Sequence, residues 1–115
     1  MNLLNLFRKP AGLKEIKPAA LLQKIDGAQK PVLIDVRTGM EYTAGHIQGA
    51  RSFPLGKETV AVEGLNPDTP VVLICKTGHR SQAAAHSLAK MGFRDLSHLS
   101  GGMDRWKKDK LPLEK

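Results

Sequence analysis

The residue of this chain best suited to covalent chemistry is Cys75, which is its only cysteine. Cys75 ends the apolar run VVLIC (71–75) and is followed by the polar segment KTGHRS (76–81). Ligands of open parallel sheets bind beyond the carboxyl ends of the strands, which is where this cysteine would stand. A thiol there can act as a nucleophile when its surroundings favour the thiolate. The alternative is a buried small residue without a chemical role, which is the commoner situation of a free cysteine.

The segment after Cys75 has the composition of an anion-binding loop. Gly78 permits a sharp turn from the strand into the next helix, and successive backbone N–H groups in such a turn can surround an anion. The N-terminus of that helix adds positive potential, and basic side chains add more. We therefore predict Cys75 as the nucleophile and the segment after it as the substrate-binding loop. The predicted binding residues are Lys76, Thr77, Gly78, His79, Arg80 and Ser81.

Several of these residues also have plainer interpretations. Arg80 could bind the anionic end of a substrate or pair with a structural carboxylate. Lys76 and His79 could steer the anion or only be solvated. Ser81 could hydrogen-bond the reacting sulfur or serve as an ordinary helix N-cap, and those two roles are compatible.

Two further groups of residues are assigned structural roles near the site. Asp35, Arg37 and Glu41 are expected to form a buried or half-buried ion network, because charges in such places need partners. Gly101 and Gly102 are expected to let the backbone pass close to the cysteine loop.

No metal site is predicted. One cysteine cannot supply a four-thiolate site, and none of the four histidines has the i, i+4 spacing of a metalloprotease helix. His46 is expected to be a hydrogen-bonded structural histidine, and His86 and His98 are given no role. Trp106 is expected in the core or in a pocket wall.

The elements that must position these residues alternate along the chain. Short apolar runs at 31–36 and 70–75 are typical of buried parallel strands, and 51–55 and 96–99 are shorter strand candidates, with an edge strand at 13–16. Helices are predicted for 18–25, 81–91 and 102–109. This alternation predicts an α/β domain with a mostly parallel sheet and helices on both faces.

Length and charge limit the possible partners. The 115 residues suit a single domain at 13–115, preceded by an N-terminal arm at 1–12 that we expect to pack on the domain. The net charge of +7 favours an anionic small substrate, whereas 4% aromatic residues and no nucleic-acid-binding signature argue against nucleic acid. No apolar run is long enough for stable membrane insertion. A free thiol is easiest to keep reduced in the cytoplasm, which is the predicted location.

Three motifs make the sequence resemble the rhodanese-like domain family of single-domain sulfurtransferases. LIDVRTGMEYTAGHIQGARSFPL (33–55) resembles the N-terminal signature of that family, and VVLICKTGHRS (71–81) resembles its active-site loop. LSGGMDRWKKDKLPL (99–113) resembles its C-terminal signature. The three motifs occur in the family's order and cover most of the chain from about residue 13.

The resemblance implies both a fold and a reaction. The fold is a three-layer α/β/α sandwich around a mostly parallel sheet of about five strands. Cys75 would accept a sulfane sulfur from thiosulfate or another persulfide donor, and pass it to cyanide, a small thiol or a protein cysteine. The only intermediate is a covalent persulfide on Cys75, so no metal or organic cofactor is expected.

Two other functions are weighed against sulfur transfer. Four residues separate Cys75 from Arg80, one fewer than in the similar phosphatases, and the shorter loop favours a sulfur atom over a phosphate or arsenate group. A non-enzymatic module for protein interaction or redox sensing is the other alternative, against which the intact cysteine and basic loop argue. Lys76 departs from the arginine of many active members, which puts its affinity for thiosulfate in question.

Overall fold

A computed structural model describes residues 12–115 of the chain. Its centre is a five-stranded sheet in the order β1-β5-β4-β2-β3, and every neighbouring pair of strands is parallel. The strands are β1 (Lys14–Ile16), β2 (Val32–Asp35), β3 (Arg51–Ser52), β4 (Val71–Ile74) and β5 (Leu96–Leu99). The strands predicted at 31–36, 70–75 and 96–99 are therefore confirmed, as is the edge strand at 13–16.

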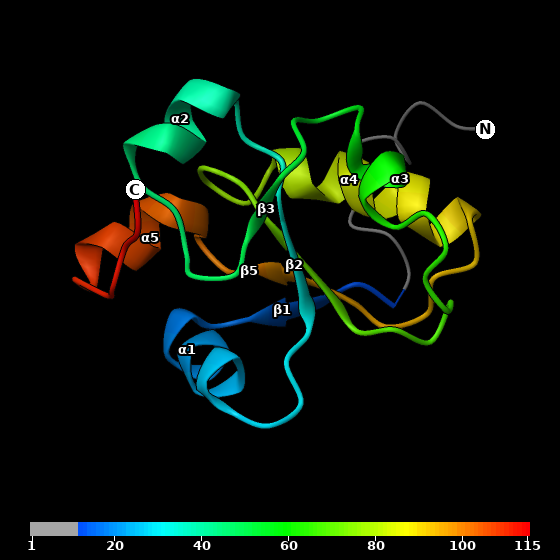
Figure 1. Cartoon of the computed structure of the whole chain (residues 1–115), viewed down its shortest axis with the longest axis horizontal. Coiled ribbons are helices and arrows are strands. Elements are labelled where there is room, and N and C mark those ends of the chain that lie inside the picture. Colours follow the sequence, from blue (N-terminus) through cyan, green and yellow to red (C-terminus); the bar gives the residue numbers. More distant parts are fainter. Residues whose placement is uncertain (1–11) are drawn as a thin grey trace.

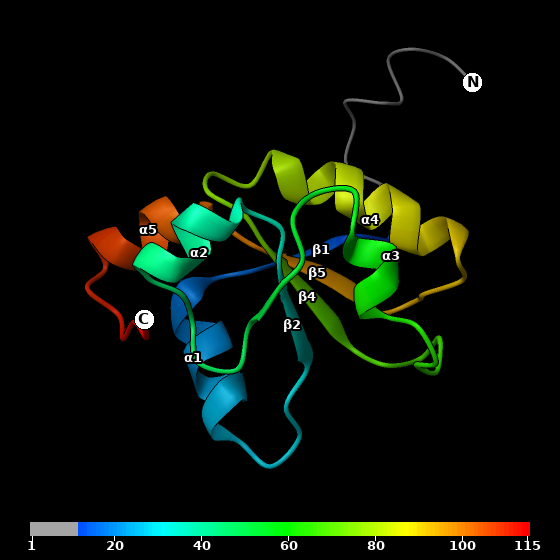
Figure 2. The same cartoon turned by 45° about the horizontal axis from the view of Figure 1, so that its top comes forward.

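Helices cover both faces of this sheet (Figures 1 and 2). They are α1 (Pro18–Asp26), α2 (Gly39–Ala44), α3 (Glu58–Ala61), α4 (Arg80–Lys90) and α5 (Gly102–Lys108). In Figure 2, α3 and α4 lie on one side of the sheet, and α1, α2 and α5 lie on the other. The predicted three-layer α/β/α architecture is thus confirmed.

Strand β4 separates the two halves of the core. All four of its residues are buried, as expected for a central strand covered on both faces. Val71, Leu73 and Cys75 pack in the cluster under α3 and α4, whereas Val72 and Ile74 pack in the cluster under α1 and α5. Because side chains alternate along a strand, this register sends the Cys75 thiol toward α4.

The third strand is shorter than the one predicted at 51–55. Backbone hydrogen bonds continue past β3. The Phe53 N–H donates to the Asp35 carbonyl, and the Leu55 N–H donates to the Val36 carbonyl. Pro54 lies between those donors and has no N–H group to offer the ladder. The chain therefore leaves the sheet at this point.

One predicted helix differs by one residue at each end, and two short helices were not predicted. The helix predicted for 81–91 begins at Arg80 and ends at Lys90, and Met91, which follows it, is 46% exposed. The short helices α2 and α3 were not predicted. α2 begins with a capping box, in which Thr38 and Glu41 each bond the other's backbone N–H.

The structure describes the C-terminal end of the chain fully and the N-terminal end only from Gly12. The arm predicted at 1–12, with its expected packing on the domain, lies outside the described residues except for Gly12. Trp106 is fully buried beneath the sheet, and its Nε1–H donates to the Pro112 carbonyl at 2.8 Å. Within residues 12–115, the model contains no helix with the length and apolar character needed to cross a bilayer.

Candidate active site

Cys75 is the first residue after β4, and its thiol is enclosed by the loop that follows. The residue is only 1% exposed. Gly78 has a φ of +106°, which glycine adopts readily, and this turn directs its N–H group at the Cys75 Sγ from 2.9 Å. One of the backbone N–H groups predicted to surround an anion therefore points at the sulfur.

Ser81 lies on the other side of the sulfur. Its Oγ is 3.5 Å from the Cys75 Sγ and donates to the Gly78 carbonyl at 3.0 Å. The N-cap position of α4 is taken by His79, so of the two roles left open for Ser81, that of a helix N-cap does not apply. Because Ser81 is the second residue of the helix, its hydroxyl points back into the loop and reaches the sulfur.

The beginning of α5 holds the loop from a third side. The Met103 N–H donates to the Cys75 carbonyl at 2.8 Å, and the Asp104 N–H donates to the Lys76 carbonyl at 3.0 Å. These are backbone donors of the first helical turn, which have no partner within their own helix. A Cβ atom on Gly102 would lie 2.4 Å from the Lys76 oxygen and 2.5 Å from the Cys75 oxygen. Only glycine lets the two segments come this close.

Arg80 is held by a carboxylate in this structure. Its Nη1 and Nη2 donate to the two oxygens of Glu41 at 3.1 and 3.2 Å. The pKa of Arg80 is raised, chiefly by this hydrogen-bonded pair and to a smaller extent by the charge of Cys75. The structure thus shows the carboxylate pairing that the sequence left open, and the role of Arg80 in substrate binding stays a prediction.

The predicted ion network is split into two pairs. Asp35 and Arg37 form a fully buried pair with three side-chain hydrogen bonds, and Arg37 Nη2 also donates to the Gly45 carbonyl at 2.8 Å. Glu41 is not part of that pair, because it turns to Arg80 instead. The buried pair fixes the end of β2, and the half-buried pair ties α2 to the cysteine loop.

The Glu41–Arg80 pair leads to a pH-dependent prediction. Hydrogen bonds from Arg80 are the largest of the causes that lower the pKa of Glu41 to about 2. A folded-state pKa below the ordinary value means that the pair stabilises the fold above about pH 4.5, and that this contribution is lost as the pH falls toward 2. We expect the difference in unfolding free energy between the wild type and Glu41→Gln to be largest near neutral pH and to shrink progressively below about pH 4.5.

Glutamine is a matched replacement here, because Gln also serves in a capping box and keeps the bond to the Thr38 backbone. Urea unfolding at a series of pH values measures the difference between the two proteins. A constant difference down to about pH 3 would show that the charge of Glu41 is not what stabilises the loop.

The remaining predicted loop residues lie at the rim of the site. Lys76, Thr77 and His79 are exposed. The Lys76 Nζ is 2.9 Å from Asp104 Oδ2, and both side chains are about half exposed. Lys76 thus has a carboxylate partner on α5 and is not simply solvated.

One histidine that was given no role lies next to the site. His98, in β5, is 4% exposed, and its Nδ1 is 3.1 Å from the Ser81 Oγ. Its Nε2 lies 3.5 Å from Glu15 Oε1 in β1. The sequence offered a weak signal, because His98 lies in the strand candidate at 96–99, next to Leu99. His46, by contrast, is the structural histidine expected, with Nδ1 2.9 Å from the Tyr42 carbonyl.

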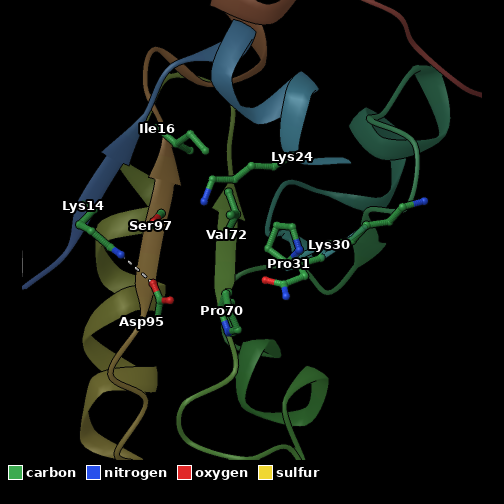
Figure 3. Close-up of a pocket in the computed structure, with 11 residues that line it drawn as sticks. Lys14, Ile16, Lys24, Lys30, Pro31, Pro70, Val72, Asp95 and Ser97 are labelled. Atoms are coloured by element: carbon green, nitrogen blue, oxygen red, sulfur yellow. Dashed lines mark hydrogen bonds and ion pairs between the residues drawn. The ribbon is translucent and has the colours of Figure 1, made fainter. Parts of the chain in front are cut away.

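The cavity in Figure 3 belongs to the opposite end of the sheet. It measures about 400 Å³ and lies where β4 and β5 begin, between residues such as Pro70, Val72 and Ser97. Lys14 and Asp95 close one side of it with an ion pair of 2.8 Å. Cys75 does not line this cavity, which is therefore separate from the site around the thiol.

The arrangement around Cys75 can support nucleophilic substitution at sulfur. The thiol has an N–H donor at 2.9 Å and a hydroxyl at 3.5 Å, so a negative charge on it would be hydrogen-bonded. The carbonyls of Cys75 and Lys76 are held by the N–H groups of α5.

Comparison with known proteins agrees with this geometry. A family model described as "Rhodanese-like domain" matches residues 17–109. The chain is 36% identical over 96 residues to thiosulfate sulfurtransferase GlpE of Pseudomonas putida, covering 82% of this chain and 84% of GlpE. It is also 33% identical to YrkF of Bacillus subtilis, a protein named as a sulfur carrier, with 84% of this chain matched. The chain spans about half the length of YrkF (52%).

A solved structure supports the same assignment. The rhodanese-related protein of Thermoplasma volcanium superimposes with a TM-score of 0.74 and 26% sequence identity, covering 88% of this chain and 97% of that protein. The family match extends from α1 to the end of α5 and includes all the residues around Cys75 described above except Glu15. The chain therefore belongs to the rhodanese-like domain family.

Proposed function

We propose that this protein is a sulfurtransferase in which Cys75 carries sulfur as a persulfide. The observation that carries the proposal is the backbone N–H of Gly78, which points at the Cys75 sulfur from 2.9 Å at the carboxyl end of β4. A sulfur atom that becomes anionic needs such a donor, whereas a purely structural cysteine does not. The name of GlpE as a thiosulfate sulfurtransferase supports thiosulfate as one donor.

The proposed reaction is a double displacement that needs no added oxidant, metal or cofactor. The Cys75 thiolate attacks the sulfane sulfur of thiosulfate, the S–S bond of the donor breaks, and sulfite leaves with the bonding electron pair. Cyanide or a thiolate then attacks the outer sulfur of the Cys75 persulfide. The Sγ–S bond breaks, the product is thiocyanate or a new persulfide, and the Cys75 thiolate is restored.

The loop supports sulfur rather than phosphate as the transferred group. The four residues between Cys75 and Arg80 include Gly78, which turns its N–H onto Sγ itself. Arg80 is engaged by Glu41 through both of its terminal nitrogens, whereas phosphoryl transfer would need this guanidinium turned toward the phosphate oxygens. We also propose a cytoplasmic location, because the free thiol must stay reduced to accept sulfur.

Mass spectrometry of the intact protein tests the proposal. After incubation with thiosulfate, we expect a gain of one sulfur atom on Cys75, followed by its removal and the release of thiocyanate when cyanide is added. Polysulfide and a protein persulfide serve as alternative donors, because Lys76 lacks the bidentate fork of arginine.

The same preparation separates the rival functions. No sulfur adduct from any of the three donors, together with slow alkylation of Cys75 at neutral pH, would favour a non-enzymatic interaction or redox-sensing module. Turnover of an aryl phosphate or of arsenate without sulfur loading would favour phosphate-type chemistry.

A further inference from the structure

We propose that His98, supported by Glu15, removes the thiol proton of Cys75 through the hydroxyl of Ser81. The inference rests on the proposed role of Cys75 as the nucleophile, and it assigns positioning residues for the activation of that thiol. Neither His98 nor Glu15 touches the reacting sulfur. Both act through Ser81, which does.

The four side chains form a continuous line from the sulfur to the edge of the sheet. The Ser81 Oγ is 3.5 Å from the Cys75 Sγ and 3.1 Å from the His98 Nδ1. On the far side of the imidazole ring, Nε2 is 3.5 Å from Glu15 Oε1. Cys75, Ser81 and His98 are buried, whereas the side chain of Glu15 is 55% exposed.

The sheet register explains why these residues meet. Glu15 in β1 is the direct partner of His98 in β5, and His98 is in turn the partner of Leu73 in β4. Partners in adjacent strands point to the same face, and Cys75 follows Leu73 by two residues. The thiol, the imidazole and the carboxylate therefore share the face of the sheet that is covered by α4, where Ser81 lies.

The hydrogens that Cys75, Ser81 and His98 can carry show how the imidazole takes up the thiol proton. In the thiol form, the Cys75 S–H can donate to the Ser81 Oγ, and the single Ser81 hydrogen is then available to the Gly78 carbonyl or to an unprotonated His98 Nδ1. If the thiol proton moves to Oγ while the hydroxyl proton moves to Nδ1, the products are a thiolate, a neutral serine and an imidazolium. No proton is lost, and the Ser81 hydroxyl hydrogen now faces the sulfur anion.

The surrounding charges favour these products. The carboxylate of Glu15 faces the Nε2–H of the imidazolium from β1. On the side of the sulfur, Arg80 of α4 and Cys75 interact favourably when the thiol is ionised. Lys76 and Asp104, the charged groups where the loop meets α5, neutralise each other in their own pair. The separated charges are thus each opposed by a group of opposite sign.

The rate of alkylation of Cys75 by iodoacetamide, measured against pH, tests the inference. His98→Asn keeps a polar group that can bond Ser81 but cannot take up a proton. We expect its rate profile to move to higher pH by about one pH unit, because the thiolate then forms without the nearby positive charge of the imidazolium. Ser81→Ala should move the midpoint at least as far.

The double variant distinguishes a relay from two separate structural effects. If His98 acts only through Ser81, the midpoint for His98→Asn/Ser81→Ala should equal that for Ser81→Ala alone. Additive shifts, or an unchanged midpoint in a folded His98→Asn protein, would overturn the inference. His86→Asn, which changes a histidine on α4 outside the line, is the control and should leave the profile unchanged.

If the substitutions at the buried residues prevent folding, a substitution at the partly exposed Glu15 tests the inference instead. Glu15→Gln changes a half-exposed side chain, and we expect a smaller upward shift of its midpoint, while an unchanged midpoint would overturn the inference. Alkylation needs no sulfur donor, so the two proposals can fail separately. A wild-type protein that shows the relay but accepts no sulfur would contradict only the proposed function, and a protein that accepts sulfur without the shifts would contradict only the relay.

Discussion

A Cys75→Ser variant is expected to lose sulfur transfer by at least ~10³-fold, which is the scale on which enzymes lose activity with their nucleophile. The serine hydroxyl can still accept the Gly78 N–H that now bonds the sulfur, so the loop should keep its shape. What is lost is a thiolate that can form a bond to a sulfane sulfur. Thiocyanate production from thiosulfate and cyanide measures the effect.

Cys75 is the only cysteine, which makes the variant easy to interpret. No other thiol can take up sulfur in its place, so the mass of the protein should stay unchanged in the presence of any donor. Lys76→Ala is a suitable control in the same loop, because it removes a rim charge and keeps the thiol, and it should still form the adduct. Sulfur transfer by Cys75→Ser at more than a small fraction of the wild-type rate would place the chemistry elsewhere.

Gly102→Ala is expected to destabilise the protein by about 3 kcal/mol, from about 1–2 kcal/mol for a positive φ and a similar amount for overpacking. The φ of Gly102 is +59°, and its Cβ would meet the Cys75 and Lys76 carbonyl oxygens within 2.5 Å. Both contacts are with backbone, which cannot rotate away as a side chain can. The loop must therefore move, and a displacement of about 1 Å can cost roughly 100-fold in sulfur transfer.

Gly64→Ala is the matched control for this prediction. Gly64 also has a positive φ, +78°, but a Cβ there would meet no atom within 4 Å. Gly64→Ala should lower the free energy of unfolding only by the cost of the positive φ, about 1–2 kcal/mol, and leave sulfur transfer unchanged. Urea unfolding and the cyanide assay measure the two effects. Equal losses in both variants would mean that the close approach at Gly102 does not hold the loop.

The sheet was predictable because its strands are marked by continuous apolar runs. Runs at 31–36 and 70–75 have no alternation, which is typical of strands buried on both faces. β3 was harder to delimit, because Pro54 interrupts its ladder while the backbone hydrogen bonds on either side continue. The capping box at Thr38 and Glu41 was a signal for α2 that our sequence reasoning did not use.

The nucleophile and the turn of the active-site loop could be predicted from the sequence, but the partners of the surrounding side chains could not. The position of Cys75 and the turn at Gly78 follow from local sequence, since both depend on where a strand ends. The partners of Arg80 and His98 do not, because Glu41 and Glu15 come from distant segments that only the fold brings near. A basic side chain in a loop looks the same in the sequence whether it faces solvent or a carboxylate.

The contact between α5 and the cysteine loop also has a consequence for the order in which the protein is made. Residues 101–104 come after Cys75 in the sequence, and β1 pairs with no strand other than β5 within residues 12–115. While the ribosome is still adding residues up to Leu99, neither the sheet edge nor the back of the loop has its partner. The thiol therefore acquires its final surroundings only after residues 101–104 have been translated.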